Sequence, residues 1–217
     1  MKILVLVLAR KGSKRLKNKN ILKINNKSLV ARTIHFAKKL PYVTKIMLST
    51  DDSRIAKIGK KNKIYVPWLR PKIISGQNTT SEKAALHAIN WYEKKVEKIN
   101  GVLLLQPTSP FRSLSIFKTI IKMYKKNYKK NYVSVSQSKR NSKLYSFKKV
   151  LNTKDRKNKK FYKPNGSLYL ISPKKLKKQK VFVPKDSIGI LFKNKKDQID
   201  IDNKFDLSYA KSFIKNE

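Results

Sequence analysis

The sequence contains no cysteine, and only 12 of its 217 residues are acidic. The absence of cysteine excludes disulfide bonds and thiolate metal sites. No apolar run approaches the about 20 residues that a membrane-spanning helix requires, so we expect no membrane partner. The first apolar run leads into a charged loop and not into a small-residue cleavage site, which argues against a signal peptide. We therefore expect a cytoplasmic protein.

Basic residues outnumber acidic residues by 54 to 12, which gives a formal net charge of +42. Such an imbalance is typical of nucleic-acid-binding proteins. The lysines, however, are spread along the whole chain and arginine is scarce, whereas a nucleic-acid footprint concentrates on one element and favours arginine. We interpret the charge as compositional drift and expect no specific nucleic acid as a partner. A basic, non-catalytic nucleic-acid-binding protein stays open as an alternative.

Strand-like and helical patterns alternate along the chain. The strand-like runs cover residues 3–9, 45–50, 64–68, 101–106, 132–137 and 166–172. The helical patterns cover residues 30–37, 51–61, 80–98, 116–124 and 207–214. This alternation predicts an α/β, Rossmann-like architecture, in which helices cover both faces of a mostly parallel sheet. A chain of this length suits a single domain over residues 1–217.

A strongly basic loop, ARKGSKRLKNKN, follows the first strand. Ligands of open α/β sheets bind beyond the carboxyl ends of the strands. Gly12 and Ser13 allow a tight turn whose backbone N–H groups can form an anion nest. Arg10, Lys14 and Lys19 carry positive charge that can neutralise a triphosphate. The loop is neither a Walker loop nor a GxGxxG loop, so the residues alone leave both phosphate binding and a solvated basic loop open.

The segment LLLQPTSPFR, residues 103–112, ends a buried strand in a glutamine, two prolines, two hydroxyls and an arginine. The prolines fix the backbone, so Gln106 and the neighbouring hydroxyls are expected to be held in place. An ordinary strand-to-helix turn, capped by Ser113, explains the segment equally well.

Carboxylates gather near the C-terminal end of the chain, in the segment QIDIDNKFDL. Asp200 and Asp202 alternate with Ile199 and Ile201 in a run that reads as a strand, which places both carboxylates on one face. Two carboxylates on one face suit Mg²⁺, which also takes phosphate oxygens and water. Alternatively, Asp202 caps the last helix and Asp200 pairs with a lysine. The scarcity of acidic residues favours the metal.

A second acidic pair, Asp51 and Asp52 in the segment STDD, is interpreted as a helix start, because carboxylates are stabilised at the positive end of the helix dipole. His35 and His87 have no partner in any motif, so neither is assigned a catalytic role.

Taken together, six segments resemble the CMP-sialic acid synthetases, also called acylneuraminate cytidylyltransferases. In chain order they are LARKGSKRLKNKNI, LSTDD, LRPKIISGQNTTS, LLLQPTSPFR, YKPNGSLYLI and IDIDNKFDL. The resemblance implies a Mg²⁺-dependent reaction in which a nine-carbon 2-keto sugar acid attacks CTP and releases pyrophosphate. The related 3-deoxy-manno-octulosonate (KDO) cytidylyltransferases share the beginning and fit the QPTSP and PNG segments less well. They stay open as an alternative.

The resemblance also implies roles for individual residues. The nucleotide is expected to contact Arg10, Gly12, Ser13, Lys14, Lys19, Asn20, Arg70 and Ser81. The sugar acid is expected to contact Gln106, Arg112, Lys163, Asn165, Tyr169 and Phe182. The metal ligands are expected to be Asp200 and Asp202, and the catalytic residues Arg10, Lys19 and Asp202.

Three positions depart from the family pattern. Lys163 replaces an arginine, and lysine cannot make the same bidentate contact with a carboxylate. Gln77 replaces an aspartate, and Lys11 replaces a small or amide residue. The family is dimeric, with an arm that reaches across to the partner. The polar stretch 139–163 is the candidate for this small inserted dimerisation arm, so we expect a homodimer.

Overall fold

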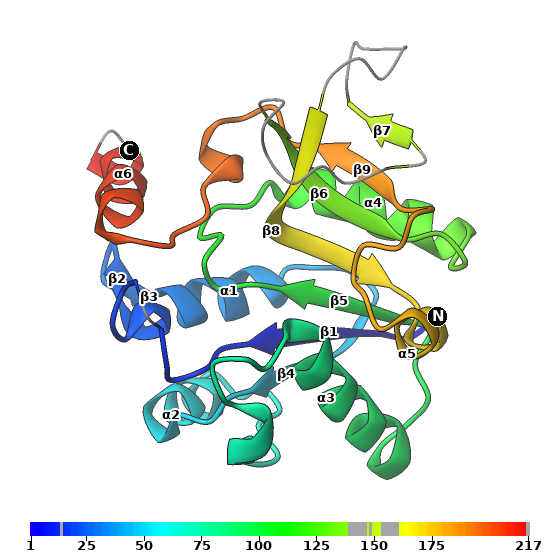
Figure 1. The fold of residues 1–217 in the computed structure, drawn as a ribbon, viewed down its shortest axis with the longest axis horizontal. Coiled ribbons are helices and arrows are strands. Elements are labelled where there is room, and N and C mark those ends of the chain that lie inside the picture. The colour runs from blue at the N-terminus through cyan, green and yellow to red at the C-terminus, as the bar shows by residue number, and fades with distance from the viewer. Residues whose placement is uncertain (14, 139–146, 148, 153–160, 216–217) are drawn as a thin grey trace.

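In the computed structural model, the described residues are 1–13, 15–138, 147, 149–152 and 161–215. They fold around a seven-stranded sheet with the order β4-β1-β5-β8-β6-β9-β7 (Figure 1). The strands are β1 (Ile3–Leu8), β4 (Val43–Ser49), β5 (Gly101–Leu105), β6 (Tyr132–Ser138), β7 (Lys149–Leu151), β8 (Phe161–Ile171) and β9 (Ile188–Leu191). β1 is parallel to β4 and β5, and β9 is parallel to β6 and β7, whereas β8 is antiparallel to both neighbours. The predicted mostly parallel sheet is confirmed.

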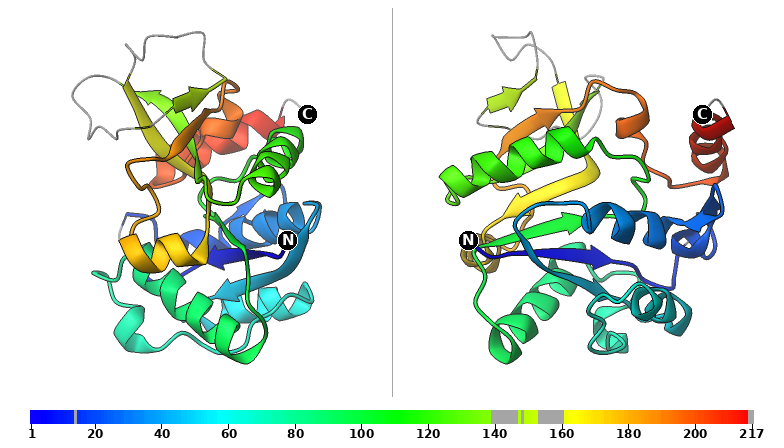
Figure 2. Two further views of the ribbon diagram at one scale, coloured as in Figure 1. Left: turned by 90° about the vertical axis from the view of Figure 1, so that its right-hand side faces the viewer. Right: turned by 180° about the vertical axis from the view of Figure 1, so that it is seen from behind.

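Helices cover both faces of the sheet (Figure 2). They are α1 (Leu29–Ala37), α2 (Ser53–Lys61), α3 (Ser81–Lys95), α4 (Leu114–Lys126), α5 (Pro173–Gln179) and α6 (Lys204–Lys215). Successive side chains of a strand point to opposite faces. Accordingly, Ile3, Val5 and Val7 of β1 pack with α1 and α4, while Leu4 and Leu6 pack with α3 and α5. Both faces of β1 are therefore core, as its uninterrupted apolar run predicts.

Short elements surround the loop that follows β1. They are η1 (Lys19–Ile21), η2 (Lys72–Ile74), η3 (Lys196–Gln198) and the hairpin of β2 (Lys23–Ile24) and β3 (Lys27–Ser28). Asn25 and Asn26 at the hairpin turn have φ values of 46° and 57°. Asparagine tolerates this left-handed region better than most residues, which suits it to a two-residue hairpin.

Two expected strands are wrong. The run at residues 64–68 contributes only an isolated bridge from Tyr65 to Met47 of β4, and a second bridge joins Leu69, just after the run, to Thr50. Residues 199–202 form no strand; they follow η3, and the N–H of Ile201 donates to the carbonyl of Thr108 at 2.8 Å. The segment is therefore held by a hydrogen bond to the loop after β5. Lys14 and most of the candidate arm at 139–163 lie outside the described residues. In the described part of the chain, no helix is long and apolar enough to cross a membrane.

Asp52 caps the start of helix α2: its carboxylate accepts the N–H of Arg54 at 2.8 Å and pairs with the Arg54 guanidinium at 2.7 Å. The hydrogen bond from the Arg54 side chain lowers the pKa of Asp52 below its ordinary value. Asp52→Ala is expected to lower the free energy of unfolding by about 1 kcal/mol at pH 7. Because the folded-state pKa is lowered, this difference disappears as the pH falls through it.

Urea unfolding of both proteins at pH 7 and in acid measures this effect. Ser113→Ala is the matched control, because Ser113 precedes α4 without making a side-chain capping hydrogen bond. An Asp52→Ala protein that is as stable as the wild type at pH 7 would contradict the capping role.

Candidate active site

A cavity of about 240 Å³ opens where β1 and β5 end. Its walls come from the loop after β1, from residues 70–84 and from the loop after β5. Of the residues predicted to bind substrate, it is lined by Arg10, Gly12, Ser13, Lys19, Asn20, Arg70, Ser81 and Gln106. The carboxyl ends of parallel strands meet at one edge of a sheet, and a site at this edge is the arrangement that open α/β sheets favour.

Two hydrogen bonds hold the loop after β1 in place. The Asn20 amide donates to the carbonyl of Arg10 at 2.9 Å, and the N–H of Lys11 donates to Asp51 Oδ1 at 2.8 Å. Between these contacts lies Gly12, where an added Cβ would have no atom within 4 Å. The loop is thus fixed by its own residues and leaves open space at Gly12, which suits backbone contact with an anion.

Two guanidinium groups face the cavity. Arg70 is only 6% exposed, and its Nη2 lies 3.6 Å from Asp51 Oδ1. Burial lowers the pKa of Arg70, Asp51 opposes this, and Arg10 lowers the pKa further. Arg10 donates to the carbonyls of Gly76 and Gln77, both at 3.2 Å. A polyanion in the cavity would relieve the repulsion between the two cations.

Asp51 is a site residue that the sequence interpretation missed. Helix capping accounts for the STDD motif, and the structure assigns that capping to Asp52 alone. Asp51 instead joins the backbone of Lys11 to the guanidinium of Arg70. The available signal was its position just after β4, the strand that pairs with β1.

The two isoleucines of the IDID segment are buried: Ile199 is 6% exposed and Ile201 is 0% exposed. Asp200 and Asp202 are not buried, as the alternation predicts. The hydrogen bond from Ile201 to the carbonyl of Thr108 fixes the segment beside the loop after β5. Both carboxylates are therefore held next to the cavity although the segment is not a strand.

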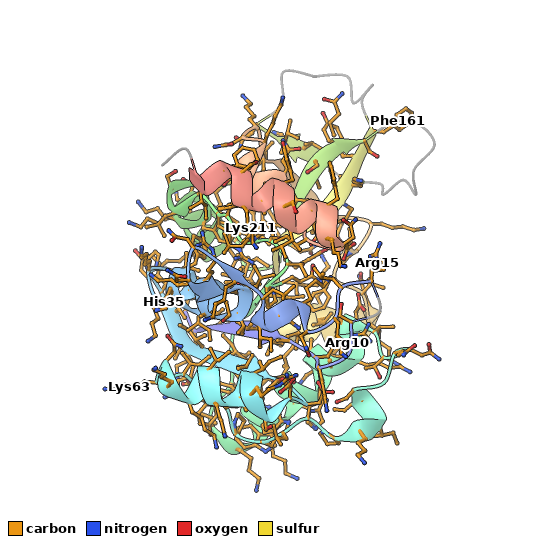
Figure 3. All side chains as sticks on the ribbon, turned by 90° about the vertical axis from the view of Figure 1, so that its left-hand side faces the viewer. Arg10, Arg15, His35, Lys63, Phe161 and Lys211 are labelled. Atoms are coloured by element: carbon orange, nitrogen blue, oxygen red, sulfur yellow. The ribbon has the colours of Figure 1, made fainter. Side chains whose placement is uncertain are left out.

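Asp202 pairs with two cations of the loop after β1. Lys19 Nζ lies 2.8 Å from Oδ1, and Arg15 Nη2 lies 2.5 Å from Oδ2. Burial alone would raise the pKa of Asp202, but Lys19 and Arg15 together lower it. The alternative that Asp202 caps the last helix is wrong. The side chain of Asn203 accepts the backbone N–H of Asp206, and the Asp206 carboxylate accepts the backbone N–H groups of Asp202 and Asn203. Arg10 and Arg15 lie on the same side of the molecule (Figure 3).

Asp200 lies in an environment that suits a cation. Its side chain reaches solvent, yet the surrounding protein desolvates it enough to raise its pKa. A hydrogen bond from Thr108 opposes this shift, and the neighbouring Asp202 and Asp206 carboxylates add to it. Hard oxygen donors of this kind fit Mg²⁺. No group of three or more His, Cys, Asp or Glu side chains in the described residues could hold a metal, so substrate oxygens and water would have to complete the coordination.

Arg112, predicted to contact the acid, donates hydrogen bonds to the loop after β5 and to β8. Its Nη2 donates to the carbonyl of Gln106 at 2.5 Å, and its Nε donates to the carbonyl of Ser167 in β8 at 3.4 Å. Enclosure by protein lowers the pKa of Arg112 to about 9. Arg112 does not line the cavity, and it connects Gln106 to β8.

The other residues predicted to contact the acid are distributed around β8. Asn165 is 6% exposed, and protein groups engage its amide. Phe182 is 3% exposed and packs against Tyr169, with 5.5 Å between the ring centroids. Lys163 is exposed on β8. Of the residues predicted to contact the acid, Gln106 lines the cavity, whereas Arg112, Asn165 and Phe182 are not among its lining residues.

Comparisons with known proteins show which family the chain resembles. A family model described as cytidylyltransferase matches residues 4–216. The chain is 29% identical to the CMP-N,N'-diacetyllegionaminic acid synthase of Legionella pneumophila, over 99% of this chain and 97% of that protein. It is 28% identical to the pseudaminic acid cytidylyltransferase of Campylobacter jejuni, over 99% and 97% of the two chains.

A solved structure of a CMP:2-keto-3-deoxy-manno-octonic acid synthetase complexed with CTP has a TM-score of 0.71 to this chain and covers all of it. The match includes 99% of that protein at 14% identity, so it shows a shared fold. The Rossmann-like architecture is confirmed, and so is the resemblance to the CMP-sialic acid synthetases that the six motifs predict. On the match over residues 4–216, the chain belongs to the cytidylyltransferase family.

Proposed function

We propose that this cytidylyltransferase transfers CMP from CTP to a nonulosonic, sialic-type acid and releases pyrophosphate. The observation that carries the proposal is the ion pair between Lys19 and Asp202, at 2.8 Å. This ion pair connects two parts of the site. One is the cationic loop after β1, which suits a triphosphate, and the other is the carboxylate pair of Asp200 and Asp202, which suits a divalent cation. The relatives named for legionaminic and pseudaminic acids support the choice of acid.

The nucleotide half of the site uses the loop after β1 and the segment from Arg70 to Ser81. Arg10, Lys19 and the backbone at Gly12 would hold the phosphates. Arg10 would exchange its two carbonyl acceptors for phosphate oxygens, which accept stronger, charge-assisted hydrogen bonds. Asn20, Ser13, Arg70 and Ser81 line the same cavity and would hold the rest of the nucleotide.

The carboxylate half of the site would hold Mg²⁺ through Asp200 and Asp202. When bound, the ion supplies positive charge to the reacting phosphate and lowers the pKa of the attacking hydroxyl. Asp202 would also keep Lys19 beside the phosphates. Arg15 is 68% exposed, so its contact with Asp202 contributes little and does not block a cation.

In the reaction, the anomeric hydroxyl of the acid would attack the α-phosphorus of CTP. The bond from that phosphorus to the bridging oxygen of pyrophosphate would break. Arg10 and Lys19 would offset the negative charge that develops on the leaving group. Gln106, which lines the cavity beside the carboxylates, would orient the acid, with Lys163 and Tyr169 near it on β8.

A panel of acids tests the proposal by pyrophosphate release in the presence of CTP and Mg²⁺. The panel contains N-acetylneuraminic, N,N'-diacetyllegionaminic, pseudaminic and 3-deoxy-manno-octulosonic acids. Release with a nonulosonic acid, and none when ATP replaces CTP, is the expected result. Release with 3-deoxy-manno-octulosonic acid alone would contradict the proposed substrate and favour the KDO alternative.

We further propose a homodimer, in which residues 139–163 reach the partner. This proposal comes from the family resemblance, and sedimentation equilibrium at micromolar concentration checks it. A monomer under these conditions would contradict it.

A further inference from the structure

Strand β8 bulges at the point where it passes the active site. In its antiparallel pairing with β6, Val133 lies opposite Tyr169, and Val135 lies opposite Pro164. Ser134 alone therefore stands opposite residues 165–168. Bulges of this kind redirect a strand and are frequent beside active sites, so the residues that hold this one in shape bear on the geometry of the site.

A buried network of side chains holds the bulge. Ser134 Oγ donates to Asn165 Oδ1 at 2.6 Å and accepts the N–H of Leu168 at 2.8 Å. The Asn165 amide nitrogen donates to Ser136 Oγ at 3.1 Å, and its oxygen also accepts the N–H of Ser167 at 3.2 Å. Both ends of the Asn165 side chain thus bind protein groups, and it is 6% exposed.

The crest of the bulge is Gly166, which has a φ of +80°. A Cβ at this position would lie 2.5 Å from Gln106 Oε1, 3.4 Å from Ser109 Oγ and 3.7 Å from Asp200 Oδ2. The crest therefore touches Gln106, which lines the cavity, and lies close to one of the proposed metal ligands. Only glycine combines this backbone conformation with so close an approach.

We propose that Asn165 is a positioning residue that binds no substrate. With Ser134 and Ser136, it fixes how closely Gly166 approaches Gln106, and thereby the position of the Gln106 amide. This inference rests on the proposed function, because it assigns Gln106 to the acid. The walls that would hold CTP come from the loop after β1 and from residues 70–84. Disturbing the bulge should therefore impair use of the acid and leave CTP binding intact.

The direct test is Gly166→Ala, assayed with the panel acid that the wild type uses best. A displacement of about 1 Å in a positioning group costs about 100-fold in rate, so we expect kcat/KM for the acid to fall about 100-fold. The Kd for CTP, measured by calorimetry, should stay within about twofold of the wild type, because the residues assigned to CTP lie in the loop after β1 and in residues 70–84, whereas Gln106 follows β5. An unchanged kcat/KM, or a Kd that rises as much as kcat/KM falls, would overturn the proposal.

Gly101→Ala is the matched control. Its new Cβ would lie 2.7 Å from Tyr124 Cε1, within the core and away from the cavity. It should lower the melting temperature without changing the kinetic constants of the folded enzyme. If Gly101→Ala lowered kcat/KM for the acid as much as Gly166→Ala does, the effect would be general destabilisation, and the proposal would fail.

Ser136→Ala and Asn165→Ala test the network with milder changes that keep Gly166. A positioning role predicts that both raise KM for the acid and that their effects are not additive in the double variant. If Asn165→Ala has a large effect while Ser136→Ala has none, Asn165 contacts the acid itself and the inference is wrong. A wild type that uses no acid of the panel contradicts the proposed function. If the wild type is active and the variants have its kinetic constants, only this inference is contradicted.

Discussion

Asp202→Asn is expected to lower kcat about a thousandfold and to leave the Kd for CTP within about threefold of the wild type. Metal-assisted stabilisation of a phosphoryl transition state contributes several kcal/mol, and each 1.36 kcal/mol corresponds to about tenfold in rate. The substitution keeps the size of the side chain but removes the charge that holds Lys19 at 2.8 Å and would bind Mg²⁺. Pyrophosphate release at saturating Mg²⁺ and calorimetry with CTP measure the two effects.

Asp206→Asn is the control for this prediction. Asp206 belongs to the same segment, but its carboxylate accepts the backbone N–H groups of Asp202 and Asn203 at 2.8 and 3.0 Å. An asparagine oxygen can accept the same hydrogen bonds, so kcat should stay close to that of the wild type. Near-wild-type turnover of Asp202→Asn, or equal losses in both variants, would contradict the role given to Asp202.

Arg70→Met is expected to raise the Kd for CTP about 10- to 100-fold and to leave KM for the acid nearly unchanged. The guanidinium is 6% exposed and faces the cavity beside Arg10. A hydrogen bond to a charged group contributes about 1.5–3 kcal/mol, which corresponds to this range in affinity. Methionine keeps the unbranched apolar part of the side chain and removes the charged guanidinium. Calorimetric titration with CTP measures the change.

Arg54→Met is the matched substitution outside the cavity. Arg54 also pairs with a carboxylate that follows β4, but it is 50% exposed and serves the start of α2. Its loss should leave the Kd for CTP as in the wild type. If both arginine variants weakened CTP binding equally, a general loss of positive charge would explain the effect, and the proposed role of Arg70 would be wrong.

Much of the fold is predictable because the central strands are buried on both faces. β1 and β5 are continuous apolar runs, so their positions follow from composition alone. β8 is harder to predict because Pro164 and Gly166 interrupt its pattern, and β9 has only four residues. The antiparallel direction of β8 depends on its pairing with β5 and β6, which are distant in sequence.

The site residues that directly follow a predicted strand could be predicted from the sequence. Arg10, Gly12 and Gln106 lie at the cavity because they follow β1 and β5. Asp51 was hidden by a capping motif that its neighbour fulfils. The direction of the Asn165 side chain depends on a bulge opposite Ser134, and no local pattern reveals the register shift that creates it.

The reaction proposed for this site is the attack of an acid on the α-phosphorus of CTP. It is tested most directly with CTP labelled in turn at the α- and γ-phosphates, incubated with Mg²⁺ and a nonulosonic acid. We predict that the α-label enters a new ester of the acid and that the γ-label appears only in pyrophosphate. A γ-label on the acid, or an α-label only in free CMP, would show that the enzyme does not transfer CMP to the acid.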